Sequence, residues 1–322
     1  MKTYYWLIKR EFWENRGSFL WAPVIATGVF LVLNIMGIIT FEVFAARHGI
    51  RISGLNIDQL VHSMDGKDMA NLGVGIDLAM MSVSSLLGIV LGIVVFFYCL
   101  GALYDDRRDR SILFWKSLPI SDRDTVFSKA LSAAILAPVI ATVCGLIGAV
   151  VMLLMVMLVA AFHGVHLWAL LGHAHPLRTM ATIVAIIPVN LVWALPTIGW
   201  LMLCSAWARS KPFLWALAMP VGIGIMVSWF GFMGLFNVSD SWFWKNIVVR
   251  SLFSVFPNGW IDGAQINVSG SHGFDLSHHF DKLVSIGTAW SQLGRADFLV
   301  GGVIGIAMIS AAIWFRGRRD DS

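Results

Sequence analysis

The chain has 322 residues, of which 58% are apolar and 13% charged, with a net charge of +4 and a mean hydropathy of +0.77. Average soluble domains carry about 25% charged residues, so this chain has too few polar side chains to cover a water-soluble globule of its size. The composition excludes a typical soluble enzyme. What matters next is how the apolar residues are distributed along the chain.

Six long stretches contain no Asp, Glu, Lys, Arg or His, and they are between 18 and 33 residues long. A helix needs about 20 apolar residues to cross the hydrocarbon layer. We therefore expect an all-α integral membrane protein with six transmembrane helices in a single domain, 1–322. The third stretch exceeds one bilayer and predicts a tilted helix or a helical stalk. The expected spans are 19–41, 78–103, 130–162, 180–207, 213–236 and 298–315.

The basic residues between these spans indicate the orientation, because cytoplasmic loops carry an excess of Lys and Arg. Fifteen of the 23 basic residues fall in the N-terminal segment, the 104–129 loop, the 208–212 turn and the C-terminal tail. The other eight lie in the alternate loops. Both termini are therefore expected to be cytoplasmic, and this polarised distribution needs no nucleic acid partner to explain it.

The segment before the first span alternates aromatic and charged residues. Tyr5, Ile8 and Phe12 share one face at helical spacing, which predicts an amphipathic interfacial helix on the cytoplasmic leaflet. A simple membrane anchor and a more specific contact with a partner are both compatible with this pattern. The first span is too long for the apolar region of a signal peptide, so it is expected to be a retained anchor.

The cytoplasmic loop 104–129 has eleven charged residues around a large apolar cluster that includes Phe114 and Trp115. An aromatic centre with a charged rim is typical of a protein–protein contact. The alternative is an amphipathic helix on the lipid surface. Pro119 ends the first helical part, and Ser121 followed by Asp124 indicates an N-cap for the next helix.

The outer loop 237–297 divides into two parts. Its first part, 242–261, is apolar and aromatic but contains Lys245 and Arg250 and is interrupted at Pro257. This pattern predicts re-entrant or interfacial helices before the last span, since broken backbone at membrane depth requires protein or water to satisfy it. The second part is polar and predicts an exposed loop.

No nucleotide-binding or catalytic motif occurs in the sequence, so we expect no catalytic residue, no bound cofactor and no ATP hydrolysis by this chain. All nine histidines fall on the predicted outer side. A copper or zinc site is an alternative for four of them, because imidazole is a common metal ligand; the simpler explanation is that His is excluded from hydrocarbon. These four are His163, His166, His173 and His175.

Two amides lie inside predicted spans, Asn34 and Asn190, and either could line a path or bridge two helices. Prolines flank Asn190 at 188 and 196 and predict a kink there. Two GxxxG motifs permit close helix contacts. No ionisable residue lies within a predicted span, although ion-coupled carriers usually keep one. The driving energy is therefore expected to enter from outside the bilayer.

Several segments together resemble the permease subunits of bacterial type-2 ATP-binding-cassette exporters. These are IKREFWENR near the N-terminus, the six spans, the LYDDRRDRSILFWKSLPISDRDTVFSKAL loop, and the broken apolar segment before the last span. The resemblance covers nearly the whole chain but its specificity rests on the loop. It implies a multi-pass protein of the bacterial inner membrane that pairs with a second, identical or homologous permease.

The resemblance also implies two copies of a cytoplasmic ATPase subunit, which would bind the ATP. The loop would supply the coupling helix and 5–16 the connecting helix beside it. One departure from the family pattern is Asp106, where related sequences are expected to have the longer Glu. The residues that the resemblance assigns to ATPase coupling are Asp106, Arg107, Arg110, Phe114, Trp115, Lys116 and Pro119.

Two other functions stay open at this point. The first is a permease-like subunit for delivery of copper or zinc, or for maturation of an outer metalloenzyme, with the four histidines as ligands. The second is a membrane scaffold or sensor that transports nothing. An exporter, a metal-delivery subunit and a scaffold differ in their partners, so an associated ATPase or a bound metal would separate them.

Overall fold

A computed structural model describes residues 2–47, 66–109, 121–163, 172–234, 239–261 and 285–319. Within these ranges the chain is almost entirely helical and has no β-strand. Six helical stretches are long and apolar enough to cross a membrane, as the sequence predicts. They are Gly17–Phe44, Ala70–Arg108, Asp122–Phe162, Pro176–Trp207, Pro212–Phe232 and Ala296–Arg318.

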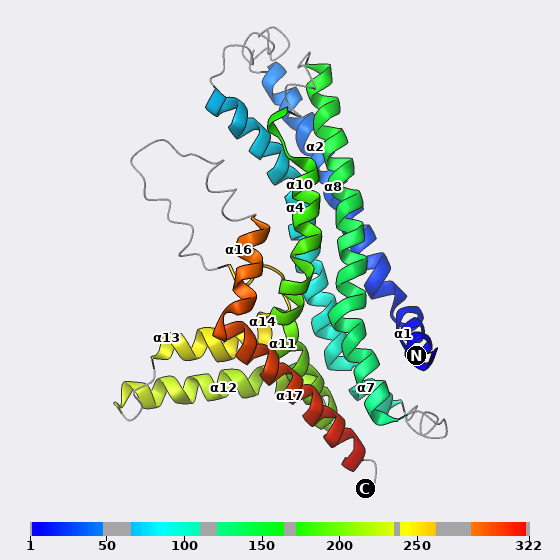
Figure 1. Ribbon diagram of the computed structural model, residues 1–322, viewed down its shortest axis with the longest axis vertical. Coiled ribbons are helices and arrows are strands. Elements are labelled where there is room, and N and C mark those ends of the chain that lie inside the picture. Colours follow the sequence, from blue (N-terminus) through cyan, green and yellow to red (C-terminus); the bar gives the residue numbers. More distant parts are fainter. Residues whose placement is uncertain are drawn as a thin grey trace.

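Three of the long helical stretches run side by side along the long axis of the molecule (Figure 1). The first begins with α1 (Lys2–Glu14), continues through a π-helical turn (Gly17–Trp21) and becomes α2 (Ala22–Arg47). The second is α4 (Gly66–Gly101), followed by the short α5 (Tyr104–Arg108). The third is α7 (Asp122–Leu131), a π-helical turn (Ser132–Leu136) and α8 (Ala137–Phe162). This third helix extends beyond its uncharged stretch, which agrees with the predicted stalk.

The fourth stretch is interrupted where the prolines predict it. Helix α10 (Pro176–Ala185) ends at Ile186, and α11 (Ile187–Trp207) begins there with Pro188 in its first turn. Proline lacks a backbone N–H and clashes with the preceding turn, so it is tolerated at a helix start and disfavours continuation through it. The predicted kink beside Asn190 is confirmed. Pro196 and Pro220 instead lie inside continuous helices.

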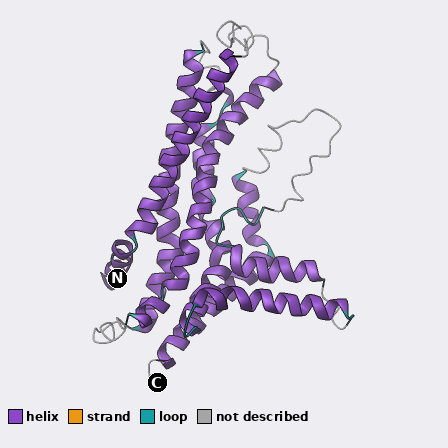
Figure 2. Cartoon of the chain, turned by 180° about the vertical axis from the view of Figure 1, so that it is seen from behind, coloured by secondary structure: helices purple, strands orange, loops and turns teal. Residues whose placement is uncertain are grey.

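The fifth stretch, α12 (Pro212–Phe232), has a different direction from the others. It projects sideways from the bundle with α13 (Asp240–Phe243) beside it, and both views show this arm (Figures 1 and 2). A further π-helical turn (Trp244–Val249) and α14 (Arg250–Phe253) return the chain to the bundle. The Trp244 indole donates a hydrogen bond to Ser228 on α12, 2.9 Å away. The segment predicted to be broken at Pro257 is helical to Phe253 and then turns.

The last elements are α16 (Ile286–Ser291), a 3₁₀ turn (Gln292–Gly294) and α17 (Ala296–Arg319). Helix α17 crosses α11 at a point where both helices carry glycine. A Cβ atom at Gly199 would overlap the carbonyl oxygen of Gly305, and one at Gly305 would overlap the backbone of Leu195. Small residues allow helix backbones to approach this closely. The second GxxxG motif therefore serves a contact within this chain.

The first GxxxG motif also packs inside the molecule. Added Cβ atoms at Gly88 and Gly92 would overlap the side chains of Pro257 and Phe256, respectively. These glycines make room on α4 for the turn that follows α14. The best-packed core lies nearby, where α4, α8 and α11 meet and where Cys99 and Cys204 are buried as free thiols. Many large apolar residues remain exposed elsewhere, as expected for a surface that faces lipid.

Helices α1 and α17 and the start of α7 lie at the same end of the molecule (Figure 1). Figure 2 shows the same arrangement from behind, with both chain ends at the bottom. An even number of spans would place both termini on one side of the membrane, and this topology stays a prediction. The two described ends of the 104–129 segment, α5 and the start of α7, also lie at this end.

The close crossing of α11 and α17 gives a stability prediction. Replacing Gly199 by Leu should force the two helices apart and lower the free energy of unfolding by about 1–3 kcal/mol, the usual range for overpacking. Gly37→Leu is the matched control, because nothing lies within 4 Å of a Cβ at that position on α2. Unfolding of both variants in mixed detergent micelles checks this. Equal stability of the two variants would contradict the observed crossing.

Candidate functional site

The structure describes the two ends of the predicted coupling loop. Asp106 and Arg107 lie on α5, and the loop's second end is α7. Five of the predicted coupling residues lie outside the described residues: Arg110, Phe114, Trp115, Lys116 and Pro119. The described part of the candidate site is therefore the base of the loop and the elements that hold it.

Helix α7 begins at the cap that the sequence predicts. The Ser121 hydroxyl accepts a hydrogen bond from the backbone N–H of Asp124 at 3.2 Å and donates one to the Asp124 carboxylate at 2.8 Å. The hydroxyl of Tyr4 on α1 also donates to this carboxylate. The Ser121 cap is confirmed. The hydrogen bond from Tyr4 holds α1 beside the start of α7, where the Tyr4 and Phe127 rings pack edge to face with their centroids 6.0 Å apart.

A fully buried carboxylate, Glu11, lies between α1, α4 and α7. Its exposed fraction is 0%. One oxygen lies 2.8 Å from the guanidinium of Arg10 and 3.4 Å from the ammonium of Lys129, and the other accepts a 2.8 Å hydrogen bond from Tyr98. An unpaired buried charge is very unfavourable. These three donors therefore explain how the negative charge is accommodated.

The ion pairs continue from Lys129 to the C-terminal helix. Lys129 lies 3.4 Å from one oxygen of Asp106, and Arg316 on α17 lies 3.3 Å from the other. The Nε of Arg316 is also 3.1 Å from Asp122 at the start of α7. Lys129 and Arg316 are only 4% and 5% exposed. The result is one chain of alternating charges, Glu11–Lys129–Asp106–Arg316–Asp122, which we name the ionic chain; it joins α1, α5, α7 and α17.

Arg107 fixes α5 to a different element. Its guanidinium donates to the carbonyl oxygens of Ser205 and Ala208 at the end of α11, the latter at 3.2 Å. The Ser205 hydroxyl accepts hydrogen bonds from the N–H groups of Leu103 and Tyr104, both at 3.0 Å. These contacts satisfy the backbone donors at the break between α4 and α5. Asp106 and Arg107, both assigned to ATPase coupling by the resemblance, thus have partners within the chain.

Helix α1 buries a different face from the one that its aromatic pattern marks. Leu7 and Glu11 are buried at i, i+4 spacing, while Ile8 and Phe12 are half-buried and Tyr5 is 62% exposed. The exposed Tyr5 agrees with an outward-facing aromatic side. The aromatic pattern gives no sign that Glu11 is buried, although its spacing from Leu7 places the two side chains on one face of the helix.

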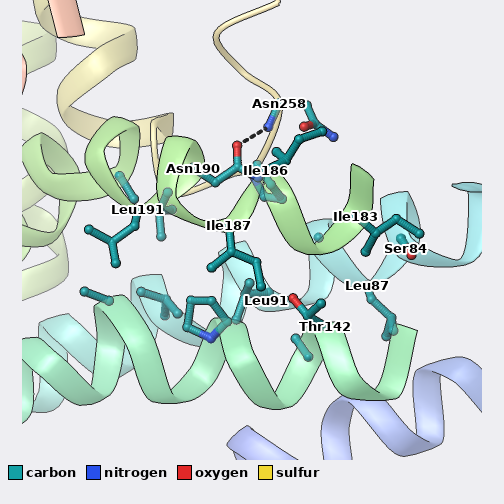
Figure 3. A pocket seen from close by; sticks show the side chains of 18 of the residues that line it. Ser84, Leu87, Leu91, Thr142, Ile183, Ile186, Ile187, Asn190, Leu191 and Asn258 are labelled. Atoms are coloured by element: carbon teal, nitrogen blue, oxygen red, sulfur yellow. Dashed lines mark hydrogen bonds between the residues drawn. The ribbon is translucent and has the colours of Figure 1, made fainter. Parts of the chain in front are cut away.

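Asn190 borders a cavity of about 120 Å³ between α4, α8, α11 and the turn after α14. Figure 3 shows its side chain directed at Asn258 on that turn. The side-chain oxygen Oδ1 of Asn190 accepts hydrogen bonds from the Asn258 backbone N–H at 3.2 Å and the Trp260 indole N–H at 2.9 Å. Asn258 has φ of 64°, a left-handed conformation that asparagine tolerates better than most residues. Asn190 therefore both borders a cavity and bridges two elements.

Asn34, the other predicted path residue, has a different environment. Its amide donates to the Phe30 carbonyl oxygen of its own helix at 2.8 Å. It borders an open pocket between α2 and α8 that also includes Glu42 and His163, and this pocket shares no residue with the Asn190 cavity. The structure does not bring the two amides together in one cavity.

The histidines considered as metal ligands are placed only in part, because His166 lies outside the described residues. The ring of His163 is 3.0 Å from the Glu42 carboxylate and 2.8 Å from the Val159 carbonyl oxygen, so it connects α8 to α2. The backbone N–H of His175 donates to the buried carboxylate of Asp77 at 3.2 Å. In the described ranges, no three His, Cys, Asp or Glu side chains are grouped closely enough to hold a metal ion.

Removing the buried charge of Glu11 should destabilise the protein. Glu11→Gln leaves Lys129 with a weaker partner, and we expect a loss of about 3 kcal/mol in the free energy of unfolding. Glu14→Gln is the control on the same helix, because Glu14 is half-exposed and pairs with Arg10 at 3.1 Å; its loss should stay below about 1 kcal/mol. Unfolding in mixed micelles measures both. A Glu11 variant as stable as the control would contradict the role of the buried pair.

The two amides should respond differently to substitution. Asn190→Leu removes the acceptor for two donors and should lower the free energy of unfolding by about 2 kcal/mol or more. Asn34→Leu removes only a bond to its own helix and should change it by less than about 0.5 kcal/mol. The same unfolding assay compares them. Similar losses from both variants would mean that Asn190 does not bridge α11 to the turn.

Comparison with known proteins adds no relative to these observations. No protein-family model, no curated protein and no solved structure matches this chain significantly. The features that bear on function are therefore the chain's own: long apolar helices, a charged loop with an aromatic centre, and an ionic chain that holds the base of that loop. What is established is a helical protein with six candidate membrane spans.

Proposed function

We propose that this chain is the membrane-spanning subunit of an ATP-driven exporter in a bacterial inner membrane. In this proposal the spans form the translocation path, and the 104–129 loop couples them to two separate ATPase subunits. A second permease, identical or homologous, completes the transporter. Both termini and the loop lie in the cytoplasm, where 15 of the 23 basic residues are expected from the sequence.

The observation that carries the proposal is the anchoring of the loop. A coupling element must transmit displacement to the helices that it joins, so its base has to be rigid. The ionic chain and the Arg107 contacts connect α5 and α7 to α1, α11 and α17. A force applied to Phe114 and Trp115, between α5 and α7, would therefore be transmitted to four of the six candidate spans, those that contain α5, α7, α11 and α17.

The environment of Asp106 also bears on the departure from the expected Glu. Its carboxylate reaches Lys129 and Arg316 of the same chain, at 3.4 and 3.3 Å. An aspartate is thus long enough for an internal role at this position. In the proposed transporter, Asp106 and Arg107 position the coupling helix, and the aromatic pair contacts the ATPase.

The sequence places no ionisable residue within the predicted spans, so we expect no coupling of transport to an ion gradient. Asn190 closes one side of a cavity through hydrogen bonds to the 258–260 turn. In the proposed cycle, ATP binding draws the two ATPases together, the coupling helices follow, and the tilt of α4, α8 and α11 opens such cavities toward the outer side. Hydrolysis restores the starting arrangement.

The test is co-purification of an ATPase with the full chain from membranes of its native host. Wild type should retain an ATPase with measurable ATP hydrolysis. The double substitution Phe114→Ala and Trp115→Ala should reduce the bound ATPase about tenfold or more, because buried interface aromatics each contribute about 2 kcal/mol or more. The matched control replaces two exposed aromatics outside both the loop and the 5–16 helix, Phe162 and Trp229.

Three outcomes separate the possible functions. Loss of ATPase in the loop variant alone supports coupling through Phe114 and Trp115. Equal retention in wild type, loop variant and control would contradict this coupling site. A wild-type protein that carries no ATPase at all would contradict the exporter and favour a scaffold or sensor.

A further inference from the structure

A second polar feature lies away from the ionic chain, in a groove of about 760 Å³. The groove is bordered by the 241–260 segment, by Trp193 on α11 and by the start of α17. It shares no residue with the Asn190 cavity. Its lining combines aromatic side chains with an unusual concentration of positive charge.

Arg250 is the residue that makes this groove distinctive. Its Nε and Nη2 atoms are buried and have no hydrogen-bond partner among the described residues. Buried polar groups are almost always paired, so two free guanidinium donors mark a place for an acceptor. Burial lowers the pKa of Arg250, and the negative charge of the Asp297 carboxylate opposes this effect. No ion pair joins Arg250 to a described carboxylate.

The surroundings of Arg250 hold it in one position. Its guanidinium lies over the ring of Trp193, 4.5 Å from the ring centre. It also occupies the space beside Gly301 on α17, where an added Cβ would overlap the guanidinium. A cation–π contact and a glycine-made recess orient the planar donor without satisfying its hydrogen bonds. The side chain is therefore preorganised for a ligand.

The charge balance of the groove favours an anion. Among the described residues that line the groove, Lys245, Arg250 and Arg295 contribute three positive charges and Asp297 the one carboxylate. Arg295 lies 3.4 Å from Asp297, so that pair largely cancels. Arg250 therefore remains as the groove cation whose guanidinium has unpaired donors among the described residues. A phosphate group matches it well, because guanidinium binds phosphate through paired, charge-assisted hydrogen bonds.

Apart from the polar side chains of Ser241, Asn246 and Ser254, the rest of the groove wall is mainly apolar and aromatic, with Trp193, Trp242, Phe253 and Trp260 along it. A free inorganic ion would leave these surfaces unused. An amphiphile would place its anionic group at Arg250 and its hydrocarbon along the aromatic wall. Trp side chains commonly lie at the level of lipid headgroups, and basic pockets between membrane helices bind anionic headgroups.

We propose that this groove is a binding site for an anionic phospholipid, whose headgroup phosphate accepts hydrogen bonds from the Arg250 guanidinium while its acyl chains lie against the aromatic wall. The site is separate from the ionic chain and from the coupling loop. It goes beyond the proposed function, and it requires only that the chain resides in a membrane.

The test uses the full chain, delipidated in a neutral detergent, with native mass spectrometry and thermal unfolding as readouts. Phosphatidylglycerol should bind and raise the unfolding temperature, because a ligand of the native state stabilises it. Phosphatidylcholine should bind far less. Arg250→Gln should lower the affinity for phosphatidylglycerol about tenfold or more, the usual effect of losing charge-assisted hydrogen bonds.

Two controls keep a folding defect from being mistaken for lost binding. Arg47→Gln removes an exposed arginine at the end of α2, outside the groove, and should bind phosphatidylglycerol as wild type does. Without lipid, Arg250→Gln should be at least as stable as wild type, since it removes a buried charge that has no ion-pair partner among the described residues. Lys245→Gln combined with Arg295→Gln alters the groove without touching Arg250 and should weaken binding less.

Three results would overturn the assignment of this groove to an anionic phospholipid. Equal phosphatidylglycerol affinity in wild type and Arg250→Gln would refute the site. Equal affinity of wild type for phosphatidylglycerol and phosphatidylcholine would refute the anion preference. Stabilisation by inorganic phosphate alone, to the extent seen with phosphatidylglycerol, would show a water-soluble anion instead of a lipid and overturn the assignment.

Discussion

The pairing of Glu11 with Lys129 is the interaction on which the rest of this structure depends. Glu11 is fully buried in a chain with few charges, and a buried carboxylate persists only where cations and hydrogen-bond donors surround it. Lys129, in turn, requires Asp106, which requires Arg316. This succession brings both terminal helices and the base of the 104–129 loop to one place. The apolar spans alone would not specify that arrangement, because lipid is as apolar as their side chains.

Above this charged end, helix packing depends on small residues and single hydrogen bonds. Glycines at 199 and 305 let α11 and α17 approach to backbone contact, and glycines on α4 admit the turn that follows α14. The side-chain oxygen of Asn190 then holds that turn in place by accepting two hydrogen bonds from it. The same turn borders the cavity on one side, and the segment before it carries Arg250. Buried polar side chains are thus few among the described residues, and most of them have a hydrogen-bond or ion-pair partner within the chain.

The local sequence predicts the six spans, the Ser121 cap and the break before Asn190. Each of these depends on local chemistry: a long stretch without charges, a short-range hydrogen bond and the sterics of proline. The local sequence does not predict that α12 projects sideways, since direction depends on tertiary contacts. Nor does it reveal the ionic chain, whose members are separated by up to about 300 residues in sequence. Glu11 looks like one more charge on an amphipathic helix until Lys129 is placed beside it. The aromatic centre of the loop, Phe114 and Trp115, stays a sequence-based prediction.

The most direct test of the ionic chain is a double-mutant cycle between its ends. Glu11 and Arg316 have no direct contact in the chain and communicate through Lys129 and Asp106. Unfolding free energies of Glu11→Gln, Arg316→Gln and the double variant give their coupling energy. One continuous chain predicts non-additive effects, with a coupling of at least about 0.5 kcal/mol. Additive effects, within about 0.3 kcal/mol, would show that the pairs act separately and would contradict this account.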